Sequence, residues 1–405
     1  MSLLYEPRRL QYLAMPDLAY AGNRSLRDLE RELGRIQTPK QSWDLTGADT
    51  HVFPPPEYAI KEMTRAATGG GVTYTPYRGD PGVREAVAAN ITAHLGMDLD
   101  PATELILTPG TQSGLFAALS ALVDEHVTVV LPDPDYLLTE RMVRYLRADV
   151  VRVSMDFSNS VAPTLDLDAV EAALHDGARV FVFSNPNNPS GGVYEPQMLV
   201  GLARLLVQYD AYAIADQLYC RLLYDDTRYA HLREMPGMAE RTITLLGPSK
   251  TESLSGYRLG VAVAPPALID AMEEVLCISA MRAPAYAQHV LTRWMDLDIE
   301  LINKRVGEYQ SLRDLAVEKL RSSSAFEVYV PQGTSYVFPK IIDPELTDQQ
   351  VAAALRRAGV VINPGYQFGA CGRGHIRICI AQGRQALSDA HDTIIDVVEG
   401  LSSRS

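Results

Sequence analysis

The stretch VFVFSNPNNPSGGVYEPQMLVGLARLLVQYDAYAIAD, residues 180–216, contains one complete unit of the fold. It begins with a short apolar run, Val180–Phe183, and continues through a turn rich in proline and asparagine into a helical stretch, Pro196–Gln208. A second apolar run, Ala211–Ala215, follows. Short apolar runs on either side of a helix are typical of parallel strands that helices cover on both faces. The stretch therefore predicts a strand, a helix and a strand of an α/β sheet.

The same alternation extends along the chain in both directions. Five further strands are expected, at Glu104–Thr108, Val127–Leu131, Val150–Ser154, Thr242–Leu246 and Leu259–Val263. Together they predict an α/β protein whose large domain, residues 50–285, has a mostly parallel seven-stranded sheet sandwiched by helices. After residue 285 a long helical stretch, about Tyr286–Arg321, is followed by short strands and helices. We expect a smaller α+β domain at residues 286–405, joined by an N-terminal segment, residues 1–49.

Composition excludes several classes of protein. The 405 residues carry a net charge of −13, from 37 basic and 50 acidic side chains, and such a surface repels nucleic acids and anionic membranes. No apolar run approaches the ~18 residues of a membrane span. The start, MSLLYEPRRL, does not have the pattern of a signal peptide, and four cysteines without a CxxC pair suggest free thiols. We expect a cytoplasmic protein with no metal site, since no His/Cys cluster has zinc-ligand spacing.

Lysine is scarce. The chain has six lysines, and none lies between Lys61 and Lys250. Lys250 follows the strand at Thr242–Leu246, in Gly247-Pro248-Ser249-Lys250. It could be a solvated loop residue, but ligands of a parallel sheet bind beyond the carboxyl ends of its strands, and Lys250 is expected at that edge.

Other strand ends carry unusual residues as well. Gly110, Thr111 and Gln112 open a helix after one strand, which is either an ordinary N-cap or a phosphate cradle at the positive end of the helix dipole. Tyr136 follows the next strand and could serve as an aromatic platform for a planar ring. The string Ser184-Asn185-Pro186-Asn187-Asn188-Pro189 must turn sharply, through a cis proline or otherwise, and would present the Asn188 amide at the sheet edge.

A carboxylate at the end of a buried strand needs a partner. Asp216 ends the run Ala211–Ala215 and is followed two residues later by Leu218-Tyr219. Burying a carboxylate there is costly unless a cation faces it, although a turn-capping role is equally compatible with the sequence. Arg258 lies eight residues after Lys250, in Leu254-Ser255-Gly256-Tyr257-Arg258.

These features, in this order, resemble the fold-type-I pyridoxal-phosphate enzymes, specifically the class I/II aminotransferase family (the aspartate aminotransferase superfamily). The resemblance extends from about Asp44 to the C-terminal helix, and its most specific stretches are Asn185–Gly191, Ala215–Tyr219 and Ser249–Gly260. One departure is Gly247, where the family often has a serine, so a phosphate contact would be lost or replaced, for example by Thr111.

The resemblance implies roles for the cofactor residues. Lys250 would form the Schiff base with pyridoxal 5'-phosphate and move the substrate proton. Asp216 would pair with the ring nitrogen, and Asn188 and Tyr219 would hydrogen-bond the ring oxygen. Tyr136 would stack on the ring. The expected phosphate ligands are Gly110, Thr111, Gln112, Ser249 and Arg258.

The resemblance also implies substrate and partner contacts. Arg377, in His375-Ile376-Arg377-Ile378, would clamp the substrate carboxylate beside Asn188, with the loop at Gly47 above it. Tyr74, or the competing Tyr77, would reach across a homodimer to the partner's phosphate. Tyr336 and Tyr20 are further candidates to line a pocket.

The implied reaction is transfer of an amino group from an L-amino acid to a 2-oxo acid. A second possibility is that the same scaffold serves a lyase, cyclase or oxidase that acts on an amino acid, because the cofactor motifs do not separate these reactions. A ligand-sensing module behind a DNA-binding domain is disfavoured, since only about 40 residues precede the aminotransferase-like part. The identities of the amino donor and acceptor stay open.

Overall fold

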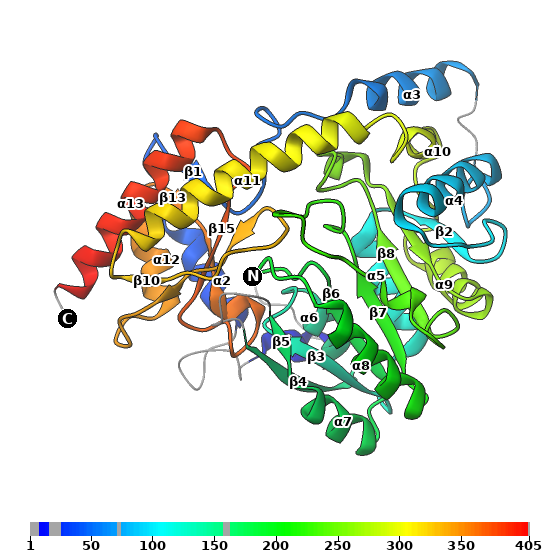
Figure 1. The fold of residues 1–405 in the computed structure, drawn as a ribbon, viewed down its shortest axis with the longest axis horizontal. Helices are drawn as coiled ribbons and strands as arrows, with labels where there is room; N and C mark the ends of the chain where they lie inside the picture. The colour runs from blue at the N-terminus through cyan, green and yellow to red at the C-terminus, as the bar shows by residue number, and fades with distance from the viewer. Residues whose placement is uncertain (1–7, 16–25, 71–73, 157–162, 404–405) are drawn as a thin grey trace.

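A computed structural model describes residues 8–15, 26–70, 74–156 and 163–403. Within these residues the largest sheet has eight strands in the order β2-β9-β8-β7-β6-β3-β4-β5 (Figure 1). The strands from β8 to β4 pair in parallel, whereas β9 is antiparallel to both neighbours and β5 is antiparallel to β4. The strands are β2 Leu105–Thr108, β3 Thr128–Asp133, β4 Asp149–Asp156, β5 Thr164–Leu165, β6 Val180–Ser184, β7 Tyr212–Asp216, β8 Thr242–Leu246 and β9 Gly260–Val263.

Helices cover both faces of this sheet because successive side chains of a strand point to opposite sides. Val182 and Ile214 pack with α5, α6 and α9 on one face, whereas Phe181 and Ala215 pack with α7 and α8 on the other. Helix α4 covers the second face beyond β8. These helices are α4 Pro81–Leu95, α5 Thr111–Leu122, α6 Thr139–Tyr145, α7 Leu167–His175, α8 Pro196–Gln208 and α9 Pro266–Ile278.

The C-terminal part of the chain builds a second core with three short sheets. Helices α11, α12 and α13 pack over strands ordered β11-β15-β14 and over the pair β10-β12, while β1 pairs in parallel with β13 (Figure 1). Tyr219 and Leu222, which follow β7, belong to this same core. The elements are β1 Trp43–Asp44, α11 Ile299–Arg321, β10 Phe326–Glu327, β11 Tyr336–Val337, β12 Lys340–Ile341, α12 Asp348–Arg357, β13 Val360–Val361, β14 Asn363–Pro364, β15 Ile376–Cys379 and α13 Arg384–Ser402.

The expected α/β architecture is confirmed, with differences in detail. All seven expected strands are present, and the two-residue β5 extends the sheet beyond them. The single long helix expected at Tyr286–Arg321 is wrong: the chain forms α10, Ala285–Gln288, then a short 3-10 helix, His289–Arg293, and only then α11. The break falls at Met295, whose φ of +68° cannot continue a right-handed helix.

The N-terminal part adds small helices at the edges of the molecule. They are α1 Arg8–Gln11, α2 Leu26–Arg35 and α3 Glu57–Thr68. Among the described helices, none combines the length and apolarity that crossing a membrane requires.

Candidate active site

The carboxyl ends of β6, β7 and β8 meet beside the second core, and a cavity of about 210 Å³ lies there. Parallel strands place their carboxyl ends at one edge, which is where ligands of such sheets bind. Many of the expected residues line this cavity together. The lining residues are Thr46, Thr111, Gln112, Leu115, Tyr136, Leu137, Ser184, Asn188, Asp216, Leu218, Tyr219, Lys250, Tyr336 and Arg377.

Asp216 is a buried carboxylate whose surroundings leave room for a cationic ligand. It ends β7, and its side chain accepts a hydrogen bond from the backbone N–H of Leu218 over 3.1 Å. Burial raises the pKa of Asp216 to about 6, against the opposing effect of the Lys250 ammonium. Within the described part of the chain, no Lys, Arg or His nitrogen lies within 4.0 Å of this carboxylate. A protonated ring nitrogen fits this position, because it would supply the missing partner.

Lys250 stands on the loop that follows β8 and lines the cavity with Asp216. The loop is closed by a backbone hydrogen bond from Leu254 N–H to Pro248 O over 3.2 Å. Lys250 is half-buried, and Ser249 beside it is half-buried as well but does not line the cavity. The structure therefore brings the expected amine and the expected carboxylate to one cavity.

The phosphate ligands expected around α5 lie side by side. Gly110 precedes α5 with a φ of +84°, and a Cβ there would lie 2.2 Å from Nη2 of Arg258. The guanidinium is thus held over the helix start, where it also donates to Ser255 O over 2.9 Å. The first N–H groups of a helix have no partner inside it, so with Arg258 they form a cradle that fits a phosphate.

The departure at Gly247 has a steric explanation. A Cβ at position 247 would lie 2.7 Å from Oγ1 of Thr111, which is the first residue of α5. The Thr111 hydroxyl is buried and donates to Leu246 O over 3.3 Å. A serine at position 247 would collide with this hydroxyl, so Thr111 already occupies the place from which such a side chain would act.

If this cradle holds the phosphate, Gly110→Ala should weaken the binding of the cofactor. The φ and ψ of Gly110, 84° and 154°, belong to a region that costs an L-residue about 1–3 kcal/mol, and the new methyl group would displace Arg258. We expect the dissociation constant for pyridoxal phosphate, measured by spectral titration, to rise about tenfold or more. Gly96→Ala is the matched control, because Gly96 also has a positive φ, +70°, but nothing within 4 Å. Equal cofactor affinity in both variants would contradict the cradle.

The turn after β6 presents Asn188 as expected. The Asn185–Pro186 peptide bond is cis, and the Asn188 backbone N–H donates to Ser184 Oγ over 3.0 Å. Asp135, two residues beyond the neighbouring strand β3, supports the turn by accepting from the Ser184 hydroxyl over 2.8 Å. Tyr136, which also lines the cavity, donates its hydroxyl to Gln112 Oε1 over 3.0 Å. These contacts hold Asn188 and Tyr136 in place at the lining of the same cavity.

Arg377 enters the cavity from the second core. Its Nη1 donates to Asn188 Oδ1 over 2.9 Å and its Nη2 to Asn363 Oδ1 over 2.6 Å. The guanidinium lies 4.0 Å from the ring centroid of Tyr336, an arrangement that favours a cation. The arginine is therefore held at the cavity with its plane fixed, which suits recognition of a carboxylate.

Sequence reasoning underestimated Tyr336 and missed Asn363. The hydroxyl of Tyr219 donates to that of Tyr336 over 3.0 Å, and burial raises the pKa of Tyr219 well above its usual value. Tyr219 follows β7, whereas Tyr336 lies in β11 and Asn363 in β14. Short strands were expected in this part of the chain, but no local pattern indicated which side chain would meet Tyr219.

Five of the expected site residues do not line the cavity: Gly110 and Arg258, which form the cradle at α5, and Gly47, Tyr74 and Ser249. Gly47 follows Thr46, which does line it, and the Gly47 carbonyl accepts from Gln382 over 2.8 Å. Tyr74 is 81% exposed and packs against the guanidinium of Arg282, 4.6 Å from its ring centroid. The competing Tyr77 packs on the same guanidinium at 4.3 Å. Ser249 lies beside Lys250 on the loop after β8, and Tyr20 lies outside the described residues.

Comparison with known proteins agrees with this geometry. The family model "Aminotransferase class I and II" matches residues 43–390. Aromatic-amino-acid aminotransferase 2 of Thermococcus litoralis is 29% identical over 351 residues, 86% of this chain and 89% of that protein. Aspartate/prephenate aminotransferase of Thermus thermophilus is 30% identical over 347 residues, 84% of this chain and 86% of that protein.

Solved structures agree as well. A crystal structure of an aspartate aminotransferase from Rhodobacter sphaeroides superimposes with a TM-score of 0.87 at 36% identity, and covers 93% of this chain and 99% of that one. The residues that the family model matches include the large sheet, most of the second core and all the residues that line the cavity. The chain belongs to the family of class I and II aminotransferases.

Proposed function

We propose that the cavity holds pyridoxal 5'-phosphate on Lys250 and transfers an amino group from an L-amino acid to a 2-oxo acid. Membership of the class I and II aminotransferase family makes the chain a pyridoxal-phosphate-dependent enzyme of amino-group transfer. The observation that carries the assignment of residues is the buried Asp216, which shares the cavity with Lys250 and has no Lys, Arg or His nitrogen of the described chain within 4.0 Å.

Each residue has a task that its surroundings support. When bound, the cofactor supplies an electron sink for the bond that breaks at the substrate Cα. The Lys250 amine attaches the cofactor and then accepts and returns the Cα proton. Asp216 holds a proton on the facing ring nitrogen by its charge. Arg377 orients the substrate carboxylate, and this selects which Cα bond faces the lysine.

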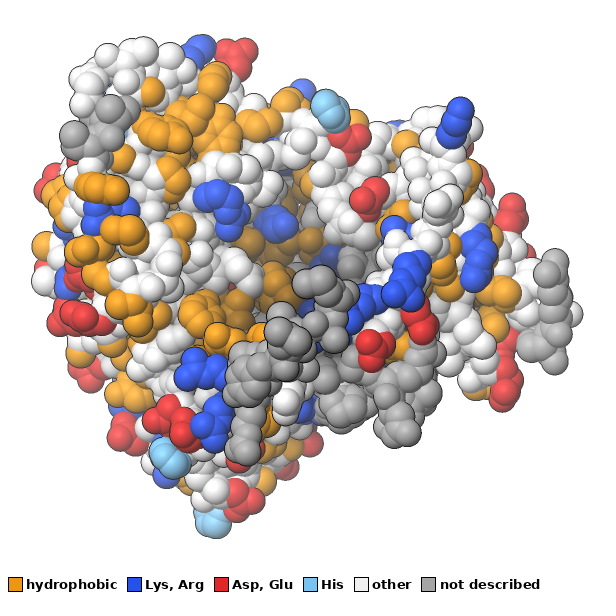
Figure 2. Space-filling view, turned by 180° about the vertical axis from the view of Figure 1, so that it is seen from behind, with side chains coloured by type: hydrophobic (Ala, Val, Ile, Leu, Met, Phe, Trp, Pro, Cys, Tyr) orange, Lys and Arg blue, Asp and Glu red, His pale blue; other side chains and the backbone are white. Residues whose placement is uncertain are grey.

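We also propose that two copies of the chain assemble, with Tyr74 of each reaching the phosphate of the other. The support is the exposure of Tyr74, together with that of Ile60 in α3 and Tyr286 in α10, two helices that contact each other. Figure 2 shows hydrophobic side chains gathered over the end of the molecule that carries these helices. The area around Tyr74 therefore suits a partner surface.

Two further expectations accompany this proposal. We propose a division into the N-terminal segment 1–49, the cofactor domain 50–285 and the small domain 286–405, supported by the separate cores of the large sheet and of α11–α13. We also propose a cytoplasmic location, supported by four cysteines that are all free.

Spectroscopy with single amino acids tests the function. Purified protein saturated with pyridoxal phosphate should lose its visible absorption when the right amino acid is added, with release of one equivalent of 2-oxo acid and no ammonia. Addition of a 2-oxo acid should restore the absorption. Ammonia release or oxygen uptake would instead indicate a lyase or an oxidase, and a protein that takes up no cofactor would refute the assignment.

Arg377→Lys should raise KM for the amino acid by about 10²-fold, with a smaller effect on cofactor affinity. Lysine keeps the charge but cannot offer the planar pair of donors that matches a carboxylate, and it would also lose the stacking on Tyr336. Steady-state kinetics measures the change. Arg313→Lys is the control, because Arg313 is equally buried but pairs with Asp225 away from the cavity. An unchanged KM in Arg377→Lys would exclude Arg377 as the carboxylate ligand.

A further inference from the structure

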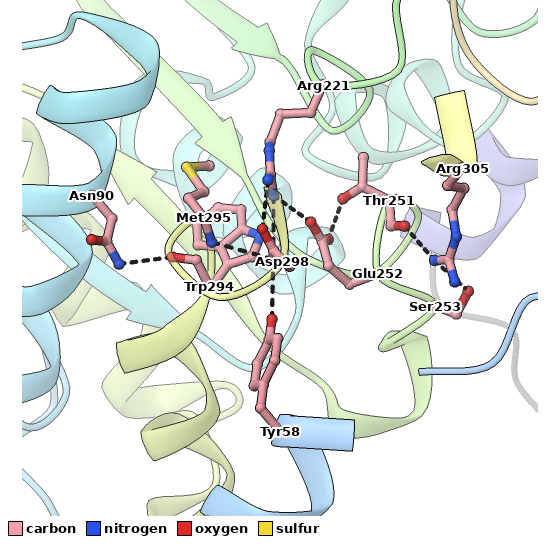
Figure 3. Close-up of polar contacts among 10 residues, drawn as sticks. All are labelled: Tyr58, Asn90, Arg221, Thr251, Glu252, Ser253, Trp294, Met295, Asp298 and Arg305. Carbon is pink, nitrogen blue, oxygen red and sulfur yellow. Dashed lines mark hydrogen bonds and ion pairs between the residues drawn. The ribbon is translucent and has the colours of Figure 1, made fainter. Parts of the chain in front are cut away.

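A buried ionic network lies outside the cavity but close to Lys250 in the chain (Figure 3). The guanidinium of Arg221 bridges two carboxylates: Nη1 donates to Glu252 Oε1 over 2.5 Å, and Nη2 donates to Asp298 Oδ1 over 2.6 Å. Both carboxylate side chains are fully shielded from solvent, and the Arg221 side chain is 12% exposed. None of the three residues lines the cavity, so the network has no direct contact with a ligand there.

The network joins the two loops that carry the reacting groups. Arg221 lies two residues after Tyr219, in the turn that follows β7. Glu252 lies two residues after Lys250 and belongs to the lysine loop, residues 250–253. The 2.5 Å ion pair between Arg221 and Glu252 therefore ties the lysine loop to the turn beyond β7. Any shift of one loop must either carry the other with it or break a buried ion pair.

Helix α11 holds the lysine loop from another direction. Asp298 immediately precedes α11, and its Oδ2 accepts a hydrogen bond from the hydroxyl of Tyr58 in α3 over 3.1 Å. Arg305, two turns into the helix, donates from Nη1 to the Thr251 carbonyl over 2.5 Å (Figure 3). The lysine loop is thus attached at a side chain and at its backbone to the helix that begins the second core.

The charges in this network do not balance. One guanidinium faces two carboxylates, and burial raises the pKa of Glu252, with the charge of Asp298 acting in the same direction and that of Arg221 opposing it. Buried ion pairs often stabilise a protein no more than apolar residues of the same shape would. The same groups do impose a defined geometry, because removing one partner leaves a buried charge uncompensated. The network is therefore better suited to fixing a position than to adding stability.

We propose that Arg221, Glu252 and Asp298 form a positioning triad for Lys250, an inference that rests on the proposed function. The two-pronged guanidinium holds the lysine loop against the turn beyond β7 and against the start of α11. The place of the Lys250 amine relative to Asp216 is thereby set before a ligand enters. The three residues act through Lys250 and touch neither cofactor nor substrate.

Arg221→Lys tests the triad, since lysine keeps the charge but cannot bond both carboxylates in the same plane. We expect kcat to fall about 10- to 100-fold with KM for both substrates nearly unchanged, because small misplacements of a reacting group cost up to about 10²-fold. Two further measurements do not depend on turnover. The pH midpoint of the cofactor's visible absorption should shift, and cofactor-free protein should take up pyridoxal phosphate more slowly.

Arg233→Lys is the matched control. Arg233 is 3% exposed and pairs with Glu104 over 2.5 Å, away from the cavity, so its replacement disturbs a buried ion pair of the same kind. It should lower the melting temperature without changing kcat or the pH midpoint. If Arg221→Lys does the same and nothing more, the triad is only structural and the inference is overturned.

A second variant keeps the triad testable if Arg221→Lys does not fold. Glu252→Gln preserves the shape of the side chain and one acceptor for Arg221, and it should give the same separation of kcat from KM. The proposed function has its own readout, because borohydride should fix the cofactor onto Lys250 of the wild-type protein. Failure of that labelling refutes the function. A second outcome separates the two proposals. If the wild type is labelled and active, but Arg221→Lys has the same kcat and pH midpoint as Arg233→Lys, the triad is refuted and the proposed function stands.

Discussion

Lys250→Ala should abolish turnover while the protein remains folded. The substitution removes both the amine that attaches the cofactor and the group that moves the Cα proton. General acid–base catalysis alone contributes about 10²–10⁴-fold, so we expect kcat to fall about 10⁴-fold or more. The half-buried side chain carries little of the core, and the melting temperature of the cofactor-free protein should change only slightly.

Mass spectrometry and added amines show whether the loss of turnover comes from the missing Lys250 amine. Borohydride should add the cofactor mass to the peptide that contains Lys250 in the wild type and to no peptide of Lys250→Ala. A small primary amine in the buffer should restore part of the lost rate, since it can replace the missing base. Lys61→Ala, at an exposed lysine of α3, is the control and should keep normal kinetics. Retention of more than about a tenth of the wild-type rate by Lys250→Ala would rule out general-base action by this lysine.

Asp216→Asn should lower kcat by about 10²–10³-fold, the range found when a single electrostatic group aimed at developing charge is removed. Asparagine has the same shape and can still accept the hydrogen bond from Leu218 N–H. It cannot hold a proton on a facing nitrogen by charge, so the loss concerns chemistry rather than folding. Steady-state kinetics, with cofactor occupancy checked by absorbance, measures the effect.

The same substitution should stabilise the cofactor-free protein in a pH-dependent way. Burial raises the pKa of Asp216 to about 6, above its ordinary value of 3.8. The folded state therefore binds more protons than the unfolded state between these values, and the wild type loses stability as pH rises through that window. Asp216→Asn avoids this loss, so it should melt higher than the wild type at pH 8, with the difference shrinking toward pH 4. A pH-independent difference would show that Asp216 does not titrate as described.

Strands and the site residues at their ends could be predicted from the sequence, because the patterns that indicate them lie within short stretches of the chain. Apolar runs such as Val180–Phe183 become buried strands because both faces of a parallel sheet are covered, whatever the rest of the chain does. Lys250, Asp216 and Asn188 could be assigned to one site because each lies at the carboxyl end of a strand of that sheet or a few residues beyond it. The carboxyl ends of parallel strands necessarily meet at one edge.

Local sequence patterns gave a wrong prediction where a helix is interrupted without a proline or a long polar loop. The helix expected at Tyr286–Arg321 is interrupted at Met295, whose φ is positive, and nearby Asp298 pairs with Arg221, which is 77 residues away in the chain. Similarly, Gly247 looked like a lost phosphate contact in the sequence. In the folded chain Gly247 lies next to Thr111, and the absence of a side chain at Gly247 leaves room for the Thr111 hydroxyl.

The sequence by itself determined the α/β architecture, the residues at the strand ends and the family resemblance, because hydrophobic periodicity and turn chemistry act over short stretches. Only the tertiary structure decided that Tyr336 meets Tyr219 and that Asn363 holds Arg377. It also decided that one buried arginine ties the lysine loop to α11. The physical reason is that such contacts join residues that lie between 14 and 117 positions apart in the chain. Their partners are selected by the packing of whole elements and leave no periodicity in either segment.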